Sequence, residues 1–492
     1  MKSPDIIIHR PFFLFLLCII LAFPLLSSAQ TVSTSSNSIT INEDSKQRQK
    51  FTICRNGTNF SVEYEGYITL SDDDRDVVAI SAGGYLKVSK SAFGSKRRVQ
   101  IEADRSGNLI RKYYVGWSQK DYEPEGRTWL AEILPVVVRS STLAAEDRVD
   151  RIYNSGGITA FTQEVQKLEG DYVKAAYLKL ILCKSLQENE INQVVQLMGT
   201  EIESDHYLSE LLMDNISVLL KNPARLSSFK AAVAKIDSDH YSNEVFQKVN
   251  RSSEVSDALL IDLLSAADNI QSDHYLSSVL IDVLRYRDLS NSGLDQLLKV
   301  SRGIQSDHYL SEVLKDAIQE TNLSSQSFRA LAEALRTVES DHYSCEVVKA
   351  MSGRELSKED LSLLLTVMGE EIESDHYLKE ALVHVLRKQD ASRIPITSFL
   401  KAVGTVGSGN YSMEVMKEIG RSTNLSSLSD AQVIEILRAC GKIDSDHYLT
   451  EALSAFAAEA KRRGGSVKEA YLQVAGNISS ETYYGRAAKA VN

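Results

Sequence analysis

IQSDHYLSEVL, at residues 304–314, contains the phrase that decides the fold of this chain of 492 residues. Its core, Ser-Asp-His-Tyr, occurs seven times, starting at Ser204, Ser238, Ser272, Ser306, Ser340, Ser374 and Ser445. The tyrosines from Tyr207 to Tyr411 follow one another at intervals of 34 residues. A fixed period of this length is typical of stacked repeats in which each unit is a helical hairpin. We therefore expect a mainly α protein, an α-solenoid of about ten hairpins.

The unit that begins at Ser306 shows how one hairpin is expected to form. Ser306 is a favourable N-cap, because its side chain can accept an orphan backbone N–H, and Asp307 places negative charge at the positive end of the helix dipole. The first helix then carries an apolar stripe at helical spacing, Tyr309, Leu310, Val313, Leu314, Ala317 and Ile318. After a turn at 321–325, the second helix carries Phe328, Leu331, Leu335 and Val338. This pattern is predicted to run over residues 141–492.

A different pattern precedes the repeats. Residues 48–140 contain runs that alternate like strands, around turns such as residues 104–108, and then a helical stretch that begins at Pro124. We expect a small antiparallel β domain with a short C-terminal helix, in which Trp129, Leu130 and Ile133 cover one face of the sheet. Residues 30–47 are rich in Ser, Thr, Asn and Gln and are predicted to be a flexible leader.

Residues 1–29 indicate a secretory signal peptide. Lys2 and Arg10 precede an apolar run at 11–26, and Ser27-Ser28-Ala29 supplies a cleavage site of small residues. The protein is therefore expected to be periplasmic or secreted, and the sequence leaves open whether the signal is cleaved or kept as an anchor. No later apolar stretch is long enough to span a bilayer, so we expect no transmembrane span in the mature chain.

Charge and motif content exclude several classes of function. The net charge of −11 is unfavourable for binding nucleic acid, whose phosphates require a basic face. No histidine is followed by glutamate, and the chain lacks CxxC, a GxSxG elbow and a phosphate-binding glycine loop. We therefore predict no enzymatic activity, no catalytic residues and no cofactor. The run Asp72-Asp73-Asp74 is interpreted as a turn rather than a calcium loop, because the remaining ligands of such a loop are missing.

The candidate site residues are the Asp, His and Tyr of each phrase. They are Asp205, His206, Tyr207, Asp239, His240, Tyr241, Asp273, His274, Tyr275, Asp307, His308, Tyr309, Asp341, His342, Tyr343, Asp375, His376, Tyr377, Asp446, His447 and Tyr448. In six of the seven phrases a glutamate follows the histidine by four residues, so the two side chains share one exposed helix face and can pair weakly. Each tyrosine is interpreted as an aromatic wedge between neighbouring hairpins.

Three interpretations of the histidines remain open. In the first, each imidazole hydrogen-bonds the Asp or a loop carbonyl of an adjacent hairpin and fixes the stacking angle. In the second, His and Glu bind a metal, although histidines one repeat apart, about 10 Å, bring at most two protein ligands together. In the third, the row is a pH-responsive surface. The unit at 408–411 favours stacking, because it keeps Tyr411 but replaces Asp-His with Gly409-Asn410.

The Ser-Asp-His-Tyr-Leu-x-Glu-Val-Leu repeats, together with Gly83-Gly84-Tyr85 and Trp129-Leu130-Ala131-Glu132-Ile133-Leu134, resemble exported bacterial proteins with HEAT-like helical repeats that are common in the Bacteroidetes. Similar regions are fused in some bacteria to sensor metallopeptidases of the β-lactam-response type. The peptidase half is missing here, so the resemblance implies an envelope location and an α-solenoid but no proteolysis.

These patterns predict a non-catalytic module that binds or scaffolds a protein partner in the cell envelope. A solenoid offers one long surface for such a partner, and the second helices, with their more varied polar residues, are one candidate binding face. Two alternatives remain. The first is a ligand-sensing or signalling accessory protein that binds its ligand around residues 83–85. The second is a metal-binding protein that uses the histidine row.

Overall fold

The computed structural model describes residues 29–34, 37–45, 48–55, 58–92, 94–253, 255–319, 323–390, 392–423 and 425–492. Residues 1–28, which hold most of the predicted signal peptide, lie outside this range. The chain divides into two compact units, Met1–Tyr177 and Leu178–Asn492. The first unit therefore extends past the predicted domain boundary at residue 140. The reason is that the first helices after that boundary are bound to the β-rich part by buried ion pairs.

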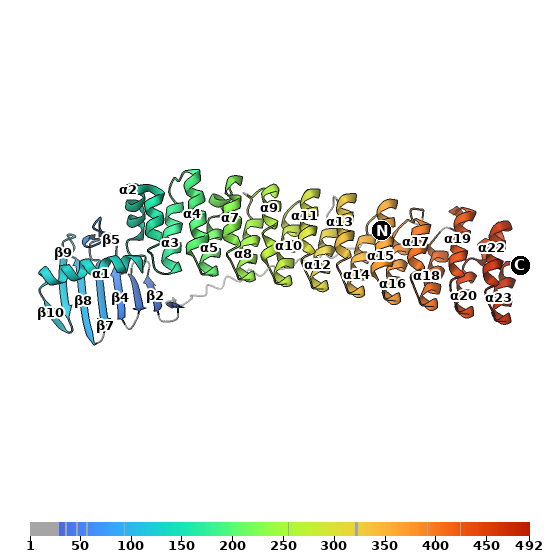
Figure 1. Ribbon diagram of the computed structural model, residues 1–492, viewed down its shortest axis with the longest axis horizontal. Coiled ribbons are helices and arrows are strands. Elements are labelled where there is room, and N and C mark those ends of the chain that lie inside the picture. The colour runs from blue at the N-terminus through green and yellow to red at the C-terminus, as the bar shows by residue number, and fades with distance from the viewer. Residues whose placement is uncertain are drawn as a thin grey trace, which may run out of the picture. The chain divides into compact units, whose positions relative to one another are not determined.

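The N-terminal unit contains an eight-stranded antiparallel sheet (Figure 1). Its strands, in spatial order, are β1 (Ala29–Thr34), β2 (Asn37–Ser45), β3 (Arg48–Arg55), β4 (Thr58–Glu65), β7 (Tyr85–Ala92), β8 (Ser95–Ala103), β9 (Leu109–Val115) and β10 (Ser118–Lys120). The hairpin β5 (Ile68–Leu70) and β6 (Val77–Ile80) forms a separate two-stranded sheet. Strands β1 and β2 occupy residues predicted to be a flexible leader. Their Thr, Val and Ile residues have high β propensity, which the Ser-rich composition obscured.

One face of the large sheet is covered by α1 (Arg127–Arg139), which follows the irregular turn η1 (Tyr122–Gly126) (Figure 1). Alternate strand residues such as Val62, Val88 and Ile101 are fully buried, as the strand periodicity requires. They pack in one cluster with Trp129, Leu130, Ile133 and Leu134. The prediction that Trp129, Leu130 and Ile133 of a short helix cover the sheet is confirmed.

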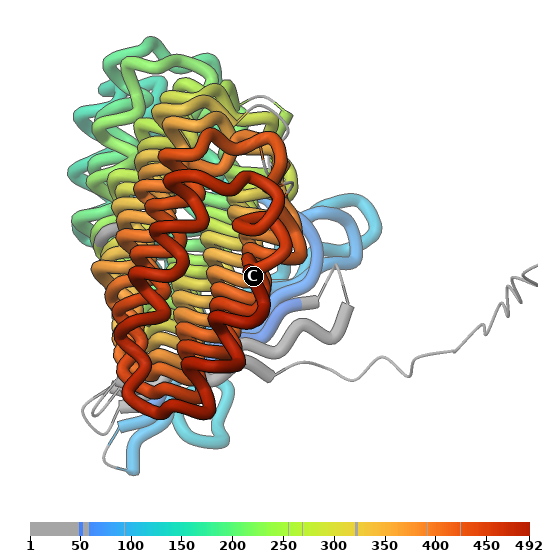
Figure 2. The backbone as a smooth tube through the Cα atoms, turned by 90° about the vertical axis from the view of Figure 1, so that its right-hand side faces the viewer, coloured from blue at the N-terminus to red at the C-terminus, as the bar shows by residue number. Residues whose placement is uncertain are grey.

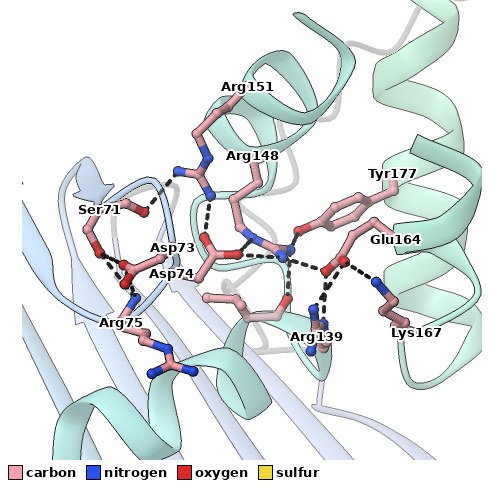
Figure 3. A network of polar contacts seen from close by, with 11 residues as sticks. Ser71, Asp73, Asp74, Arg75, Arg139, Arg148, Arg151, Glu164, Lys167 and Tyr177 are labelled. Atoms are coloured by element: carbon pink, nitrogen blue, oxygen red, sulfur yellow. Dashed lines mark hydrogen bonds and ion pairs between the residues drawn. The ribbon is translucent and has the colours of Figure 1, made fainter. Parts of the chain in front are cut away.

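A buried ion-pair network joins α2 (Ala145–Val165) and α3 (Asp171–Leu182) to the β5–β6 hairpin (Figure 3). The Arg148 side chain is 1% exposed, and its guanidinium lies 2.9 Å from Asp74 and 2.7 Å from Glu164. The same guanidinium donates a hydrogen bond to the Tyr177 hydroxyl. Arg151 also binds Asp74. Arginine at this position therefore neutralises two carboxylates away from solvent.

The acidic run 72–74 forms the turn between β5 and β6, as the sequence suggested. Asp73 accepts a hydrogen bond from the Ser71 hydroxyl at 2.7 Å, which stabilises the turn and lowers the pKa of the Asp73 carboxyl. Asp74 has φ = +57°, a backbone conformation that aspartate tolerates better than most residues. Its carboxylate binds the guanidinium groups of Arg148 and Arg151.

The C-terminal unit is a stack of helices in two layers, which we call the A and B layers (Figures 1 and 2). The A helices are α5 (Asp205–Asp214), α8 (Asp239–Asn250), α10 (Asp273–Tyr286), α12 (Asp307–Ile318), α14 (Asp341–Ser352), α16 (Asp375–Lys388), α18 (Gly409–Ser422), α20 (Asp446–Ser454) and α23 (Glu481–Val491). The B helices are α4 (Glu188–Glu201), α7 (Leu226–Val233), α9 (Asp257–Leu264), α11 (Asn291–Ser301), α13 (Ser325–Leu335), α15 (Lys358–Glu371), α17 (Ile396–Val403), α19 (Asp430–Cys440) and α22 (Gly465–Ala475). Each helix packs on the next helix of its own layer. The predicted α-solenoid after a small β domain is confirmed.

The repeat at 306–338 agrees with its predicted pattern except at the cap. The predicted apolar residues of both helices are buried, apart from the half-buried Tyr309. Ser306 occupies the N-cap position, but its side chain accepts no capping hydrogen bond, so that prediction is wrong. The side chain of Ser324 does cap its helix, by accepting from the backbone N–H of Ser327 at 3.0 Å. In this repeat, the serine that caps a helix with its side chain is therefore the one before the B helix.

Two further features follow from the spacing of the repeats. The longer interval between Tyr411 and Tyr448 is taken up by an additional 3-10 turn, η4 (Leu425–Ser427), which confirms the predicted longer loop near 423–430. Among the described residues, no helix has the length and apolar character needed to cross a membrane.

Candidate functional site

The aspartate of each phrase binds two backbone N–H groups of the next repeat. The Asp307 carboxylate accepts hydrogen bonds from Glu339 at 3.0 Å and Ser340 at 2.8 Å. The other six phrase aspartates, Asp205, Asp239, Asp273, Asp341, Asp375 and Asp446, make the same pair of contacts one repeat further on, at 2.7–3.2 Å. These N–H groups lie in the loop that enters the next A helix. A charged acceptor therefore fixes each A helix that begins with a phrase aspartate to the A helix that follows it.

The histidine and tyrosine rings form a row along the A layer that runs from Tyr207 to Tyr411 and, after the repeat without a histidine, includes His447, Tyr448 and Tyr483. The His308 ring lies 5.1 Å from its neighbour Tyr309 and 5.8 Å from Tyr343 of the next repeat, between ring centroids. The same two contacts occur at His206, His240, His274, His342, His376 and His447, with Tyr207, Tyr241, Tyr275, Tyr309, Tyr343, Tyr377, Tyr411, Tyr448 and Tyr483 as partners. Tilted ring pairs at these separations are favourable contacts. We call the aspartates and rings together the ladder.

In the structure, the aspartate and the histidine of each phrase make different contacts from those that the first interpretation of the histidines expected. That interpretation had the imidazole hydrogen-bonded to the Asp or to a loop carbonyl of an adjacent hairpin. Instead, the aspartate makes the hydrogen bonds between repeats, and the imidazole fills the space between two tyrosine rings. The short carboxylate reaches the loop N–H groups, whereas the wider imidazole spans the gap between neighbouring A helices.

The glutamates four residues after the histidines form a second row. Three of them lie 3.4–3.7 Å from their histidine, in the pairs His206–Glu210, His240–Glu244 and His376–Glu380. Others bind a lysine, as in Glu312–Lys315 at 2.6 Å and Glu451–Lys417 at 3.1 Å. Lysine is a stronger partner because its charge is permanent near neutral pH. The predicted His–Glu pairing therefore forms in part of the row only.

Hydrogen bonds from lysines of the preceding repeat lower the pKa of two carboxyls in this second row. Lys349 binds Glu380 at 3.0 Å and Lys417 binds Glu451 at 3.1 Å. Both glutamates are therefore ionised near neutral pH. They add a charged connection between repeats next to the ladder.

Metal ligands do not gather in the ladder. Within the part of the chain that the structure describes, no three His, Cys, Asp or Glu side chains lie close enough together to hold a metal ion. A tyrosine ring separates each imidazole from the next one. Among the described residues, a metal ion in the ladder would therefore find at most two protein ligands, the His and Glu of one pair, and no third.

A groove of about 560 Å³ lies on the A layer across α14, α16 and α18. It is lined by Lys349, Lys379, Glu380, Val383, His384, Arg387, Met413, Glu414, Lys417, Glu418 and Arg421. We call it the A-layer groove. Five of its side chains are cationic and three anionic, so it carries a net charge of +2 on a chain of net charge −11. Sequence reasoning missed it, although Lys379, Val383 and Arg387 recur every four residues on one helix face.

Ion pairs between repeats hold the A-layer groove in place. Arg387 binds Glu418 at 2.8 Å, and its hydrogen bond lowers the pKa of the Glu418 carboxyl. Lys379 lies 3.4 Å from Glu414. Burial lowers the pKa of His384, whose ring lies 3.0 Å from the Ser352 hydroxyl. The groove is therefore lined by ion-paired side chains of both charges together with the apolar Val383 and Met413.

A pocket of about 530 Å³ lies in the β domain, lined in part by Tyr64, Tyr67, Gly83 and Gly84. These glycines belong to the segment that the ligand-sensing alternative singled out. A side chain at Gly84 would place its Cβ 2.5 Å from the carbonyl oxygen of Glu65, so only glycine fits there. The Tyr67 hydroxyl donates to Asp147, a hydrogen bond that raises the pKa of Tyr67 to about 12.

The comparisons with known proteins add little to this description. No family model matches the chain, and no curated protein matches it. Among solved structures, a chain from the computational design of self-assembling cyclic protein homo-oligomers is 12% identical, with a TM-score of 0.09. That match covers 71% of this chain and 92% of the designed one. Fold and geometry therefore define the class, a helical repeat protein with an N-terminal β domain.

The repeat at 408–411 provides a test of the ladder. Gly409 has no carboxylate to accept hydrogen bonds from the backbone N–H groups of Asp444 and Ser445 in the next repeat. A Cβ atom at position 409 would make only ordinary contacts, 3.5 Å from Ile443 and 3.6 Å from Tyr448. We expect Gly409→Asp to raise the free energy of unfolding by about 1–2 kcal/mol, because it adds two charge-assisted hydrogen bonds. Urea unfolding followed by circular dichroism measures the change.

Gly409→Ala is the matched control for this substitution. It supplies the helix propensity of a side chain without the acceptor, which contributes at most about 1 kcal/mol. Equal stabilisation by Ala and Asp would contradict the role assigned to the phrase aspartates.

Proposed function

We propose that the protein is a non-catalytic, exported repeat protein that binds another protein in the cell envelope through the A layer of its solenoid. The observation that carries this proposal is the A-layer groove, whose lining combines ion-paired charges of both signs with the apolar Val383 and Met413. Protein interfaces combine apolar contacts with charged side chains that fix the register of the partner. The partner expected here is a chain segment with an acidic stretch, because the groove carries net positive charge.

The ladder supports this proposal indirectly. The phrase residues hold neighbouring repeats together, so stacking accounts for their repetition without a repeated binding site. The surface left for a partner lies further along the A helices, where the groove is found. A second groove of about 720 Å³ also lies on the A layer, at α5 and α8, lined in part by Asp214, Gln247 and Arg251. These grooves favour the A helices over the B helices that sequence analysis put forward.

The test is crosslinking of the mature chain in envelope preparations from its source, compared between two variants. In the first, Lys379→Glu with Arg387→Glu reverses two cations of the A-layer groove. In the second, Lys299→Glu with Lys401→Glu makes the same charge change on exposed B-layer lysines. We expect the groove variant to lose a specific crosslinked partner by at least about tenfold, as reversed charges at an interface typically cost several kcal/mol.

The B-layer control variant should capture the partner as well as the unmodified chain. Equal capture by all three proteins would contradict the proposal, because the groove would then take no part in binding. Circular dichroism must show the same helix content in both variants, so that a folding defect is not read as a loss of binding.

One observation favours the ligand-sensing alternative as a second candidate, namely the pocket lined by Gly83 and Gly84. Ala82 is exposed at its rim, so Ala82→Trp would fill the space without disturbing the core. Loss of a bound partner or ligand in this variant, with the groove variant unaffected, would assign recognition to the β domain.

A further inference from the structure

One end of the large sheet gathers cationic residues. In the strand register, Lys90 on β7 pairs with Arg97 on β8, and Arg97 pairs with Val115 on β9. The neighbouring row places Arg98 beside Tyr114, and the backbone N–H of Gly116 donates to the carbonyl of Lys96 at 2.7 Å. Lys90, Lys96, Arg97 and Arg98 therefore lie at the same end of two adjacent strands, β7 and β8, next to the end of β9.

This sheet end carries no compensating negative charge. Among its described residues, 58–60, 90–92, 94–98 and 114–120, none is Asp or Glu. Within the described chain none of the four cations forms an ion pair; instead Lys90 lies over the ring of Phe60 and Arg98 over that of Tyr114. The chain as a whole has a net charge of −11. This end of the sheet is therefore positively charged although the chain as a whole is acidic, and its four cations are available to a partner.

Trp117 stands at the same end, in the turn between β9 and β10. Its side chain is 100% exposed, whereas the other tryptophan, Trp129, is 5% exposed in the core. Val115 beside it is 37% exposed. An isolated tryptophan in water gains nothing for folding. We call Trp117 with Lys90, Lys96, Arg97 and Arg98 the basic sheet end.

We propose that the basic sheet end docks the protein on an anionic lipid surface, with Trp117 inserted at the headgroup level. Indole rings prefer the membrane–water interface, and clustered Lys and Arg attract anionic headgroups. Hydrophobic and electrostatic signals together give the two anchoring contributions that stable peripheral binding requires. This inference goes beyond the proposed protein binding and is independent of it, since it concerns the β domain alone.

A lipid surface fits the arrangement better than another anionic partner. The cations lie at the sheet end beside the turn that carries the fully exposed Trp117, and this combination suits a flat interface with a hydrophobic interior. A nucleic acid would need a longer basic track and would be repelled by the acidic remainder of the chain. The small size of the patch predicts reversible binding that weakens with salt.

The experiment is co-sedimentation of the full mature chain with vesicles of equal parts phosphatidylglycerol and phosphatidylcholine, beside vesicles of phosphatidylcholine alone. We expect binding to the anionic vesicles only, with loss of binding in 1 M salt. Lys96→Glu with Arg97→Glu should reduce the partition coefficient at least about tenfold. Lys299→Glu with Lys401→Glu, the same charge change on the solenoid, should leave it unchanged.

The fluorescence of Trp117 tests whether its side chain enters the membrane. On binding, its emission should shift to shorter wavelength, and lipids brominated on their acyl chains should quench it, while the buried Trp129 stays unaffected. Trp117→Ala should remove both signals and weaken binding by about tenfold. Tyr484→Ala, which removes an exposed aromatic ring of α23, is the matched control and should bind normally.

Two results would overturn the proposal. One is equal binding of the unmodified chain and both sheet-end variants to anionic vesicles. The other is vesicle binding that heparin, a soluble polyanion, abolishes while Trp117→Ala has no effect, which would indicate a site for anionic polymers. Neither result bears on the A-layer groove, whose variants are tested by crosslinking, so the two proposals fail independently.

Discussion

Replacing Arg148 with alanine is expected to lower the free energy of unfolding of the N-terminal unit by about 3–5 kcal/mol. The substitution removes the cation that lies 2.9 Å from Asp74 and 2.7 Å from Glu164 and leaves both carboxylates largely buried (Figure 3). Burial opposes ionisation of Glu164, but hydrogen bonds from Arg139 and Arg148 keep its pKa below the ordinary value. Without Arg148, the Glu164 carboxylate is still buried but has lost one of the two arginines that stabilise its negative charge.

Tryptophan fluorescence during urea unfolding measures this effect, because both tryptophans of the chain lie in the N-terminal unit. Arg151→Ala is the matched control. Arg151 also binds Asp74, but its side chain is 23% exposed, so we expect a cost of about 1 kcal/mol. If both variants unfold at the same urea concentration, Arg148 does not have the structural role that its burial indicates.

Asp307→Ala is expected to lower the free energy of unfolding of the solenoid by about 2–4 kcal/mol. The alanine leaves the N–H groups of Glu339 and Ser340 without their acceptor. A hydrogen bond to a charged group makes a net contribution of about 1.5–3 kcal/mol, and we expect the lower part of that range here because Glu339 is exposed to water. Asp307→Asn keeps one acceptor oxygen without charge, so it should cost about half as much. Urea unfolding followed by circular dichroism gives both values.

Hydrogen exchange gives a local check on the same substitution. The Ser340 amide should lose protection in Asp307→Ala, while the Ser374 amide, bound by the unaltered Asp341 at 2.9 Å, should keep it. Unchanged protection at Ser340 would show that the aspartate does not hold the next repeat.

The repeat architecture could be predicted because its physical cause is local and periodic. The interval of 34 residues, the apolar stripes such as Leu310, Val313 and Leu314, and the turn residues all indicate the same hairpin. The cover of the sheet by Trp129 and Leu130 was predictable for a similar reason, since a short amphipathic helix after several strands must bury its apolar face somewhere.

Other features depend on which residues meet across repeats, and a single unit does not reveal them. Asp307 resembles an ordinary first-turn charge until the loop of the following repeat is placed beside it. The A-layer groove arises only when α14, α16 and α18 lie side by side. Arg148 looks like a surface residue of an amphipathic helix, because its partner Asp74 lies 74 residues earlier in the chain.

The ladder makes the repeats interchangeable. Each unit offers the same aspartate and imidazole to its successor and receives the same pair from its predecessor, so a unit can be duplicated or deleted whole and both new neighbours still fit. The length of such a protein can therefore change in steps of one hairpin during evolution without redesign of any junction. The junction after Gly409 is the exception, because a unit moved there meets no carboxylate from the preceding helix.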